Sequence, residues 1–234
     1  MSQARRGRSR RTGRRPRKDL SAQAYTAIKD LIRRYELKPE QKLTQSELAR
    51  RVGVSLTPVR EALRALEKEG YVTPVRNRGF YVSKITVKEA EDLFDIREAL
   101  EVLSVQRAIE RRDADFLHGL EASLEEYKGV VTQALTRERI DIDQRFHLRI
   151  AQQADNESLH RMLTFVFERI TLKRKVDGAP ATRGLAAYEE HVALVEAIRH
   201  GEADRARELA ARHVRNAKDA VRRQLHERAA LLEL

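Results

Sequence analysis

Four residues in the C-terminal half of the chain have the types and spacing of a metal site. Asp143 and His147 are four residues apart, so on a helix they lie on one face. Gly201 divides a later helical stretch into a hairpin, with His191 ten residues before it and His213 twelve after it. At 1.5 Å per residue, these two histidines lie at similar heights, roughly 15 and 18 Å from the turn. One carboxylate and three imidazoles suit a divalent ion, with zinc as the first choice and nickel or manganese as alternatives.

A hydrogen-bonded polar core is the alternative interpretation of the same four residues, and spacing alone does not decide between the two. The remaining histidines lack such an arrangement and are expected to face solvent or to be structural: His118, His160, His200 and His226. The chain has no cysteine, which excludes a thiolate metal site, a disulfide framework and a cysteine nucleophile. Any metal must therefore be held by histidine and carboxylate.

Two further residues are candidates for binding a ligand beside this cluster. Arg97 lies on the same helical stripe as Leu93, Leu100 and Ser104, which predicts a buried guanidinium. A buried guanidinium needs an anion, and either Glu101 or the carboxylate of a small molecule would serve. Asn156, at the start of a later helix, is the second candidate, although it is also well placed to cap that helix.

These side chains are positioned by a run of helices that begins after a short hinge over residues 84–86. Thr86 and Glu89 form a capping box, and an apolar periodicity follows through Leu93, Leu100 and Leu103. Further helical segments are predicted over residues 114–134, 138–154, 157–176, 184–199 and 202–230. Residues 85–234 are therefore expected to form an all-α bundle of about six helices.

Residues 19–84 follow a different pattern, that of a winged helix-turn-helix. A helix is predicted from Leu20 to about Leu37, where Lys38-Pro39 ends it. Two short helices follow at residues 45–51 and 57–69, joined by a tight turn containing Gly53. Two strands at residues 71–75 and 80–82 then form a hairpin. The whole chain is thus expected to be mainly α, with one small β-hairpin.

The second short helix has the composition of a recognition helix. Ser55 and Thr57 can donate to phosphate, and Arg60 can reach a phosphate or a guanine edge. Arg78 and Gly79, at the tip of the hairpin, would bring positive charge and close backbone approach to the neighbouring groove. The other residues expected to contact DNA are Thr44, Ser46 and Leu56.

The basic charge is concentrated at the N-terminus. The net charge is +11, and residues 1–18 hold nine Lys and Arg with no acid. Residues 19–84 hold 13 basic against 8 acidic residues, and residues 85–234 hold 25 against 28. This distribution predicts a disordered basic arm over residues 1–18 that adds non-specific phosphate affinity to a double-stranded DNA module. No apolar run approaches a membrane helix or a signal peptide, so we expect a cytoplasmic protein with no membrane partner.

The stretch Val54-Ser55-Leu56-Thr57-Pro58-Val59-Arg60-Glu61-Ala62-Leu63, with the wing Asn77-Arg78-Gly79-Phe80-Tyr81-Val82, resembles the GntR family of bacterial transcription regulators. That family usually has arginine where this chain has Leu56, which cannot hydrogen-bond a base but can pack against a thymine methyl. The operator sequence is therefore expected to differ.

Residues 86–230 resemble the ligand-sensing helical domain of the FadR subfamily. In many members an Asp-x-x-x-His helix and two later histidines bind a metal, and Asp143, His147, His191 and His213 match them. The resemblance also implies that Arg97 binds a carboxylate of a small organic-acid effector held by the metal.

Together these features predict a metabolite-responsive repressor that binds a pseudo-palindromic operator as a homodimer, because two-fold symmetry doubles the readout. The sequence does not say which domain forms the dimer interface. A metal-dependent hydrolase and a DNA-binding protein with a purely structural metal site are the alternatives.

Overall fold

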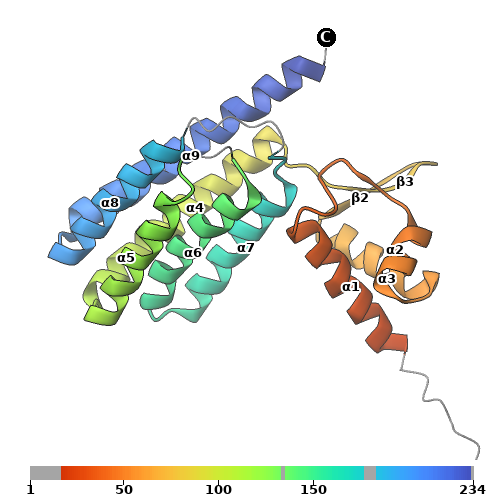
Figure 1. Ribbon diagram of the computed structural model, residues 1–234, viewed down its shortest axis with the longest axis horizontal. Coiled ribbons are helices and arrows are strands. Elements are labelled where there is room, and N and C mark those ends of the chain that lie inside the picture. Colours follow the sequence, from red (N-terminus) through yellow and green to blue (C-terminus); the bar gives the residue numbers. More distant parts are fainter. Residues whose placement is uncertain (1–16, 133–134, 177–182, 233–234) are drawn as a thin grey trace, which may run out of the picture.

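The computed structural model describes residues 17–132, 135–176 and 183–232. Within these ranges an N-terminal winged module is followed by a helical domain (Figure 1). The winged module contains α1 (Arg17–Arg33), β1 (Lys42–Leu43), α2 (Gln45–Val52), α3 (Leu56–Lys68), β2 (Val72–Val75) and β3 (Gly79–Val82). The helical domain contains α4 (Val87–Glu110), α5 (Ala114–Lys128), α6 (Arg137–Gln153), α7 (Glu157–Lys173), α8 (Gly184–His200) and α9 (Ala203–Leu232). The predicted fold class is confirmed.

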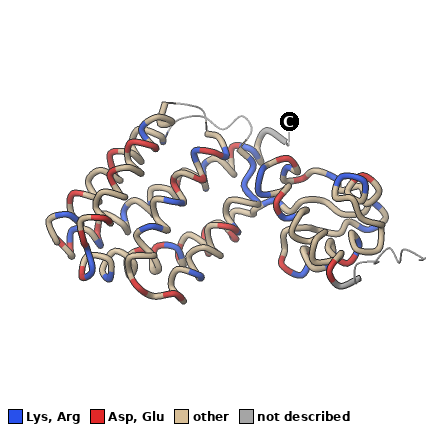
Figure 2. Tube along the Cα trace, turned by 60° about the horizontal axis from the view of Figure 1, so that its bottom comes forward, with Lys and Arg blue, Asp and Glu red and all other residues tan. Residues whose placement is uncertain are grey.

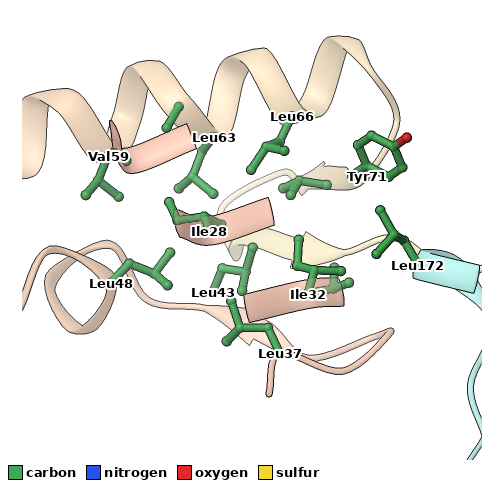
Figure 3. Close-up of a cluster of buried hydrophobic side chains, with 14 of the residues drawn as sticks. Ile28, Ile32, Leu37, Leu43, Leu48, Val59, Leu63, Leu66, Tyr71 and Leu172 are labelled. Atoms are coloured by element: carbon green, nitrogen blue, oxygen red, sulfur yellow. The ribbon is translucent and has the colours of Figure 1, made fainter. Parts of the chain in front are cut away.

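The winged module is organised around an apolar core between α1 and α3. Ile28, Ile32, Leu63 and Leu66 are almost completely buried there, and strand and loop residues such as Leu43 close the core (Figure 3). At roughly 25 cal/mol per Å² of apolar surface, each buried leucine or isoleucine contributes about 1.5–3 kcal/mol. This core fixes the orientation of α3, which is the predicted recognition helix.

The sheet of the winged module has three antiparallel strands in the order β1-β3-β2. β1 was not expected from the sequence, because a strand of two residues carries no periodic signal. Lys42 pairs with Tyr81 and Leu43 with Phe80, while Val75 pairs with Gly79 across the hairpin. Asn77 and Gly79 adopt positive φ angles of 60° and 91°, which lets the chain reverse within the predicted wing.

In the helical domain, α4 is the central helix. It packs along α9 and also against α6 and α7 (Figure 1). α5 packs against α6 and α8, and α8 also packs against α9. Acidic and basic residues are interspersed along these helices (Figure 2), in agreement with the near-neutral count for residues 85–234. No helix in the described ranges is long and apolar enough to span a membrane.

Several helix ends differ from the predicted ones. α1 begins at Arg17 and ends at Arg33, because Tyr35 takes a positive φ of 61° and turns the chain there. The first two of these helical residues, 17 and 18, belong to the predicted arm, and the rest of that arm lies outside the described residues. α5 ends at Lys128 and α7 at Lys173, each shorter than its apolar periodicity predicts. Gly129 caps α5.

The two domains are joined by the C-terminal end of α7 as well as by the chain. Leu172 is buried in the core of the winged module, beside Tyr71 (Figure 3). The backbone N–H of Ile85 donates to the carbonyl of Lys173 at 3.0 Å, and Lys173 also pairs with Glu89. The segment predicted to be a hinge is therefore attached to α7.

Candidate metal centre and DNA-binding face

The fold brings the four predicted metal ligands together. Asp143 and His147 come from α6, His191 from α8 and His213 from α9, and one ligand atom from each lies within 4.8 Å of the others. The three histidines are buried, whereas the Asp143 side chain keeps 24% of its exposure. The cluster therefore lies in the interior of the bundle with one side open.

Two further carboxylates orient the histidines. Nδ1 of His147 lies 2.8 Å from Oε2 of Glu101, and Nδ1 of His213 lies 2.7 Å from Oε2 of Glu190. If each imidazole donates its Nδ1–H to its carboxylate, the lone pair of Nε2 is left for a metal. Sequence reasoning considered Glu101 only as a partner of Arg97, and missed Glu190. Helical periodicity gave little indication of Glu190, because this residue directly precedes His191 and lies at the edge of the buried face of α8.

Both carboxylates remain ionised in the interior. Burial alone would raise the pKa of Glu101, but Arg97 and His147 lower it to about 2. The pKa of Glu190 is likewise about 2, because hydrogen bonds from His213, Arg183 and Asn216 outweigh the effect of burial. His147 and His213 thus each face a fixed negative charge on the Nδ1 side.

The buried cluster is poorly satisfied by its own hydrogen bonds. Within the described residues, Nε2 of His147 has no hydrogen-bond partner, and its nearest carboxylate oxygen, Oδ2 of Asp143, is 3.9 Å away. The Nε2 atoms of His191 and His213 are 3.3 Å apart. A buried acceptor without a donor costs on the order of 1–3 kcal/mol, and a cation between these atoms would remove that cost. The residues present therefore fit a divalent metal better than a closed polar core.

His191 and His213 are held neutral, which is the form that binds metal. Burial lowers the pKa of His191 well below its usual value, and the neighbouring His213 and His147 lower it further. Burial also lowers the pKa of His213, against the raising effect of Glu190. A metal would not have to displace a proton from either imidazole at neutral pH.

Arg97 is buried beside the cluster and is only partly satisfied. Its Nε donates to Oε1 of Glu101 at 2.5 Å, which is the intramolecular pairing considered above. Its Nη2 has no hydrogen-bond partner within the described residues and lies 4.0 Å from Oδ2 of Asp143. The guanidinium also stacks over Phe167, at 4.4 Å from the ring centre. Within the described residues, the Nη2 end of the Arg97 guanidinium is therefore free to bind an anion.

A cavity of about 520 Å³ opens next to Arg97, Asp143 and His213. Its lining is rich in arginine and also contains polar groups such as Asn216 and Thr171. The other arginines in the wall are Arg139, Arg174, Arg183 and Arg223, against the acids Asp143, Asp219 and Glu227. This volume suits a small metabolite, and the excess of arginine favours an anion.

Asn156 is not part of this cavity. Its side chain accepts the backbone N–H of Leu159 and caps α7, which is the structural role considered above. The cavity is lined by the N-terminal half of α6, near Asp143, and by the C-terminal end of α7, near Thr171. Asn156 lies at the other end of α7. We therefore leave Asn156 out of the proposed effector site. Of the other four histidines, His118, His200 and His226 are exposed and His160 is half-buried.

The residues predicted to contact DNA are all exposed and lie at three neighbouring places in the winged module. Thr44 and Ser46 are at the N-terminus of α2, and Ser55, Leu56 and Thr57 are at the N-terminus of α3. Neither cap residue, Thr44 or Ser55, uses its side chain to cap its helix, so both hydroxyls are available. Leu56 keeps 46% of its surface exposed at the start of α3.

Arg60 lies on the exposed side of α3, with its Nε 3.5 Å from Oε1 of Gln45 on α2. This long contact leaves the end of the guanidinium available to DNA. Arg78 and Gly79 are exposed at the β2–β3 turn, where the N–H of Arg78 donates to the carbonyl of Val75 at 2.9 Å. The arrangement is that of a helix-turn-helix with a basic wing.

Comparison with known proteins agrees with this architecture. Residues 20–82 match the model for "Bacterial regulatory proteins, gntR family", and residues 92–216 match the FCD domain. The chain is similar to the HTH-type transcriptional regulator YdhC of Bacillus subtilis, at 28% identity over 88% of this chain and 92% of the relative. The Nta operon transcriptional regulator of Aminobacter aminovorans is 27% identical over 80% of this chain and 87% of its own length. The fold is also similar to the solved structure of Escherichia coli McbR/YncC, with a TM-score of 0.73 at 22% identity over 88% and 98% of the two chains.

The chain belongs to the GntR family of bacterial transcription regulators and carries an FCD domain as its second domain. It is a DNA-binding regulator and not an enzyme, so the hydrolase alternative is set aside. The exposed helix-turn-helix and the cavity in the helical domain are accordingly the two candidate functional regions of the molecule.

Proposed function

We propose that the protein is a metal-dependent repressor that releases a pseudo-palindromic operator when a small organic acid binds its helical domain. In this proposal it acts as a homodimer in the cytoplasm. Asp143, His147, His191 and His213 hold a divalent ion, zinc first among the candidates, and Arg97 binds the effector. The observation that carries the proposal is the unpartnered, buried Nε2 of His147 next to a cavity rich in arginine.

The metal and the cavity belong to one site, because Asp143 and His213 line the cavity as well as the cluster. A bound divalent ion would add positive charge at this wall and offer coordination positions to an anionic ligand. Arg97 contributes the free end of its guanidinium on the same side. A carboxylate is therefore the group this wall favours, and a hydroxyl beside it would suit the polar lining.

The effector signal has a short physical route to the winged module through α7. Phe167, Ile170 and Thr171 line the cavity, while the next residue, Leu172, is buried in the winged core. Arg169 donates to the carbonyl of Glu69 at the end of α3 and pairs with Glu89 at 2.9 Å. A ligand that favours one position of α7 must change operator affinity, and DNA must change ligand affinity by the same factor.

Metal binding is tested with His191→Ala, using His200→Ala as the matched control because His200 is exposed. Both proteins are loaded with Zn²⁺, desalted and assayed by elemental analysis. We expect about one ion per chain in the wild type and the control, and little in His191→Ala. His213→Gln repeats the test with a polar side chain, with circular dichroism to check folding. Full metal content in both cluster variants would refute the metal site.

Effector binding is tested with citrate as a probe anion on the zinc-loaded protein. The operator is first selected from a random duplex library with the purified protein. We expect citrate, or a smaller hydroxy acid in parallel, to weaken operator binding by the wild type. Arg97→Lys should keep zinc and lose most of the response, because lysine cannot fork onto a carboxylate. A purely structural metal site would instead leave operator binding unchanged by any anion of the series.

The DNA face is tested with Arg60→Ala on the selected operator. We expect a loss of about 1–3 kcal/mol in specific binding if Arg60 reaches a base edge, and less if it reaches phosphate alone. Arg64→Ala, one turn further along α3 and also exposed, is the control for general loss of charge. Equal effects of the two substitutions on specific and random DNA would contradict a role of Arg60 in base reading.

A further inference from the structure

The effector cavity has a second cationic end, which is formed by Arg174 after the last turn of α7. Arg174 and Arg97 both line the cavity of about 520 Å³. Phe167, over which Arg97 stacks, precedes Arg174 by seven residues, which corresponds to a rise of roughly 10 Å along α7. On α9, Gln224 lies eleven residues after His213, or roughly 16 Å along the helix. The cavity therefore extends lengthwise from the metal cluster to Arg174.

The guanidinium of Arg174 has hydrogen bonds but no counterion. Its Nε and Nη2 donate to Oε1 of Gln224 at 3.1 and 2.7 Å, and it forms no ion pair with the described residues. These two nitrogens belong to one edge of the guanidinium, and such an edge can bind both oxygens of a carboxylate. In this structure they share one oxygen of an uncharged amide. Because hydrogen bonds to ionised groups are roughly twice as strong as neutral ones, a carboxylate is the better partner.

The charges around Arg174 also favour an anion. Burial lowers the pKa of Arg174 to about 10, Asp143 raises it, and neighbouring arginines lower it. These arginines are Arg139, Arg137 and Arg97. A metal on Asp143 would neutralise that carboxylate and leave positive charge in excess. Two further acids line the cavity, but Asp219 pairs with Arg222 at 3.1 Å and Glu227 is exposed.

Between its two cationic ends the cavity has an apolar wall. Phe94 on α4, Ile170 on α7, and Ala217 and Val221 on α9 line the cavity and pack in one apolar cluster. Hydroxyl groups of a ligand would find no hydrogen-bond partner against these four side chains, whereas methylene groups would leave water favourably. The middle of the cavity therefore favours a hydrocarbon chain over a sugar-like one.

We infer that the effector is an unbranched dicarboxylic acid, with one carboxylate at the metal and Arg97 and the other on Arg174. The inference rests on the proposed function, because it extends the proposed effector site to a second anionic group. The second carboxylate would take the place of the Gln224 amide oxygen on Arg174. A monocarboxylate would leave that contact intact, and a short diacid such as succinate would not reach both ends.

The second carboxylate would bind next to the junction with the winged module. Gln224 also donates to the carbonyl of Lys175 at 3.3 Å, and Nζ of Lys175 lies 3.7 Å from a carboxylate oxygen of Glu40. The N–H of Val176 donates to the hydroxyl of Tyr35 at 2.9 Å. Displacement of Gln224 would therefore disturb a segment that contacts the winged module. A dicarboxylate should accordingly release the operator more strongly than a monocarboxylate.

The inference is tested by calorimetric titration of the zinc-loaded, full-length protein with acids of matched length. Suberate and octanoate have carbon chains of the same length and differ by one carboxylate. We expect suberate to bind at least about 10-fold more tightly than octanoate, and also more tightly than succinate. Adipate and sebacate, with their matched monoacids, locate the best length. Equal affinities for the diacid and the monoacid at every length would overturn the inference.

Arg174→Gln tests which residue binds the second carboxylate. It should lower the affinity for suberate by about 10- to 100-fold and leave the affinity for octanoate unchanged. Arg223→Gln is the matched control, because Arg223 also lines the cavity but is exposed, and it should keep the preference for suberate. Equal losses in the two variants would mean that only the overall charge of the cavity matters, and would overturn the inference.

Gln224→Glu is a second variant that leaves Arg174 in place. Its carboxylate would pair with Arg174 from within the protein, so the preference for suberate should disappear while octanoate still binds. Zinc content and circular dichroism should be normal in each variant. A full preference for suberate in Gln224→Glu would contradict the assigned position of the second carboxylate.

The same titrations separate this inference from the proposed function. Arg97→Lys should weaken the binding of suberate and of octanoate alike, and suberate should weaken operator binding by the wild type more than octanoate does. Binding of citrate and octanoate that depends on Arg97, with no advantage for any diacid, would overturn the inference and support the proposed function. Absence of binding by every acid to the zinc-loaded wild type would contradict both.

Discussion

The two buried centres of this chain are stabilised in opposite ways. The core of the winged module is apolar throughout, from Ile28 and Ile32 on α1 to Leu63 and Leu66 on α3. The centre of the helical domain instead contains charged and polar groups, among them Arg97, Glu101 and three histidines. The three histidines are as buried as the apolar core residues, so burial alone does not distinguish the two centres. The difference is that the first consists of apolar side chains, whereas the second keeps donor and acceptor atoms that have no partner within the described part of the chain.

A complete apolar core depends only on packing, while an incomplete polar centre depends on pH and on bound ions. The first gives the recognition helix a fixed orientation under all conditions in which the protein is folded. The second makes the stability of the sensing domain a function of what it binds. This comparison predicts how the two centres should respond to the same treatments.

The largest effect is expected in the apolar core. Leu63 is 0% exposed, and Leu63→Ala removes packing and leaves a cavity, so it should lower the free energy of unfolding by about 2–5 kcal/mol. The loss should be the same with Zn²⁺ and with EDTA, as measured by urea denaturation followed by circular dichroism. A loss that depends on zinc would show that the two centres are coupled during unfolding.

The next effect concerns zinc itself. Free Zn²⁺ at about 100 times its dissociation constant should stabilise the wild-type protein by about 2.7 kcal/mol, because it binds the folded state alone. The stabilisation should disappear in His213→Gln and should remain in His226→Gln, whose side chain is exposed. Thermal melts with Zn²⁺ or EDTA measure both. Equal stabilisation in the two variants would mean that zinc binds outside the cluster.

A smaller effect is expected from a carboxylate that only orients a ligand. Glu101→Gln removes the charge that faces Nδ1 of His147, and should weaken zinc binding by about 10- to 100-fold. Glu98→Gln, on the same helix but paired with Arg215 on the outside, should leave zinc affinity unchanged. Competition with a chromophoric chelator gives both affinities. An unaltered affinity in Glu101→Gln would reduce Glu101 to a partner of Arg97.

The smallest effect is the pH dependence of the metal-free protein. His191 and His213 have a lower pKa in the folded state than the usual 6.5, so the unfolded state takes up protons first as the pH falls. Stability should therefore be retained above pH 7 and decrease by about 1 kcal/mol between pH 7 and pH 6. Urea denaturation in EDTA at the two pH values measures the change. His191→Asn should flatten it, and a stability that rises in this range would contradict the assigned pKa directions.

Sequence patterns predicted the helices and the clustering of Asp143, His147, His191 and His213, because both follow from helical periodicity. The spacing of Asp143 and His147, and the distances of His191 and His213 from Gly201, follow from helix geometry alone, and the structure brings these residues together. The effector site was harder to predict. Arg139, Arg174 and Arg183 come from separate segments, and only the packing of the bundle shows that they line one cavity.

The junction between the domains was also beyond the sequence patterns. Residues 84–86 lack periodicity and were interpreted as a hinge, whereas the N–H of Ile85 is bonded to the end of α7. Leu172 fits the apolar pattern of α7, and the pattern does not say which domain its side chain enters. Asn156 was a candidate for either a ligand contact or a helix cap, and its side chain caps α7.

The position of Leu172 limits how freely these domains can be exchanged between regulators. A winged module cut at residue 84 would lack one side chain of its own core, although that side chain is encoded about ninety residues later. A chimera with another sensing domain would need an apolar residue of similar shape at the same point of the incoming helix. Exchange of either domain of this chain is therefore constrained by the side chain at position 172.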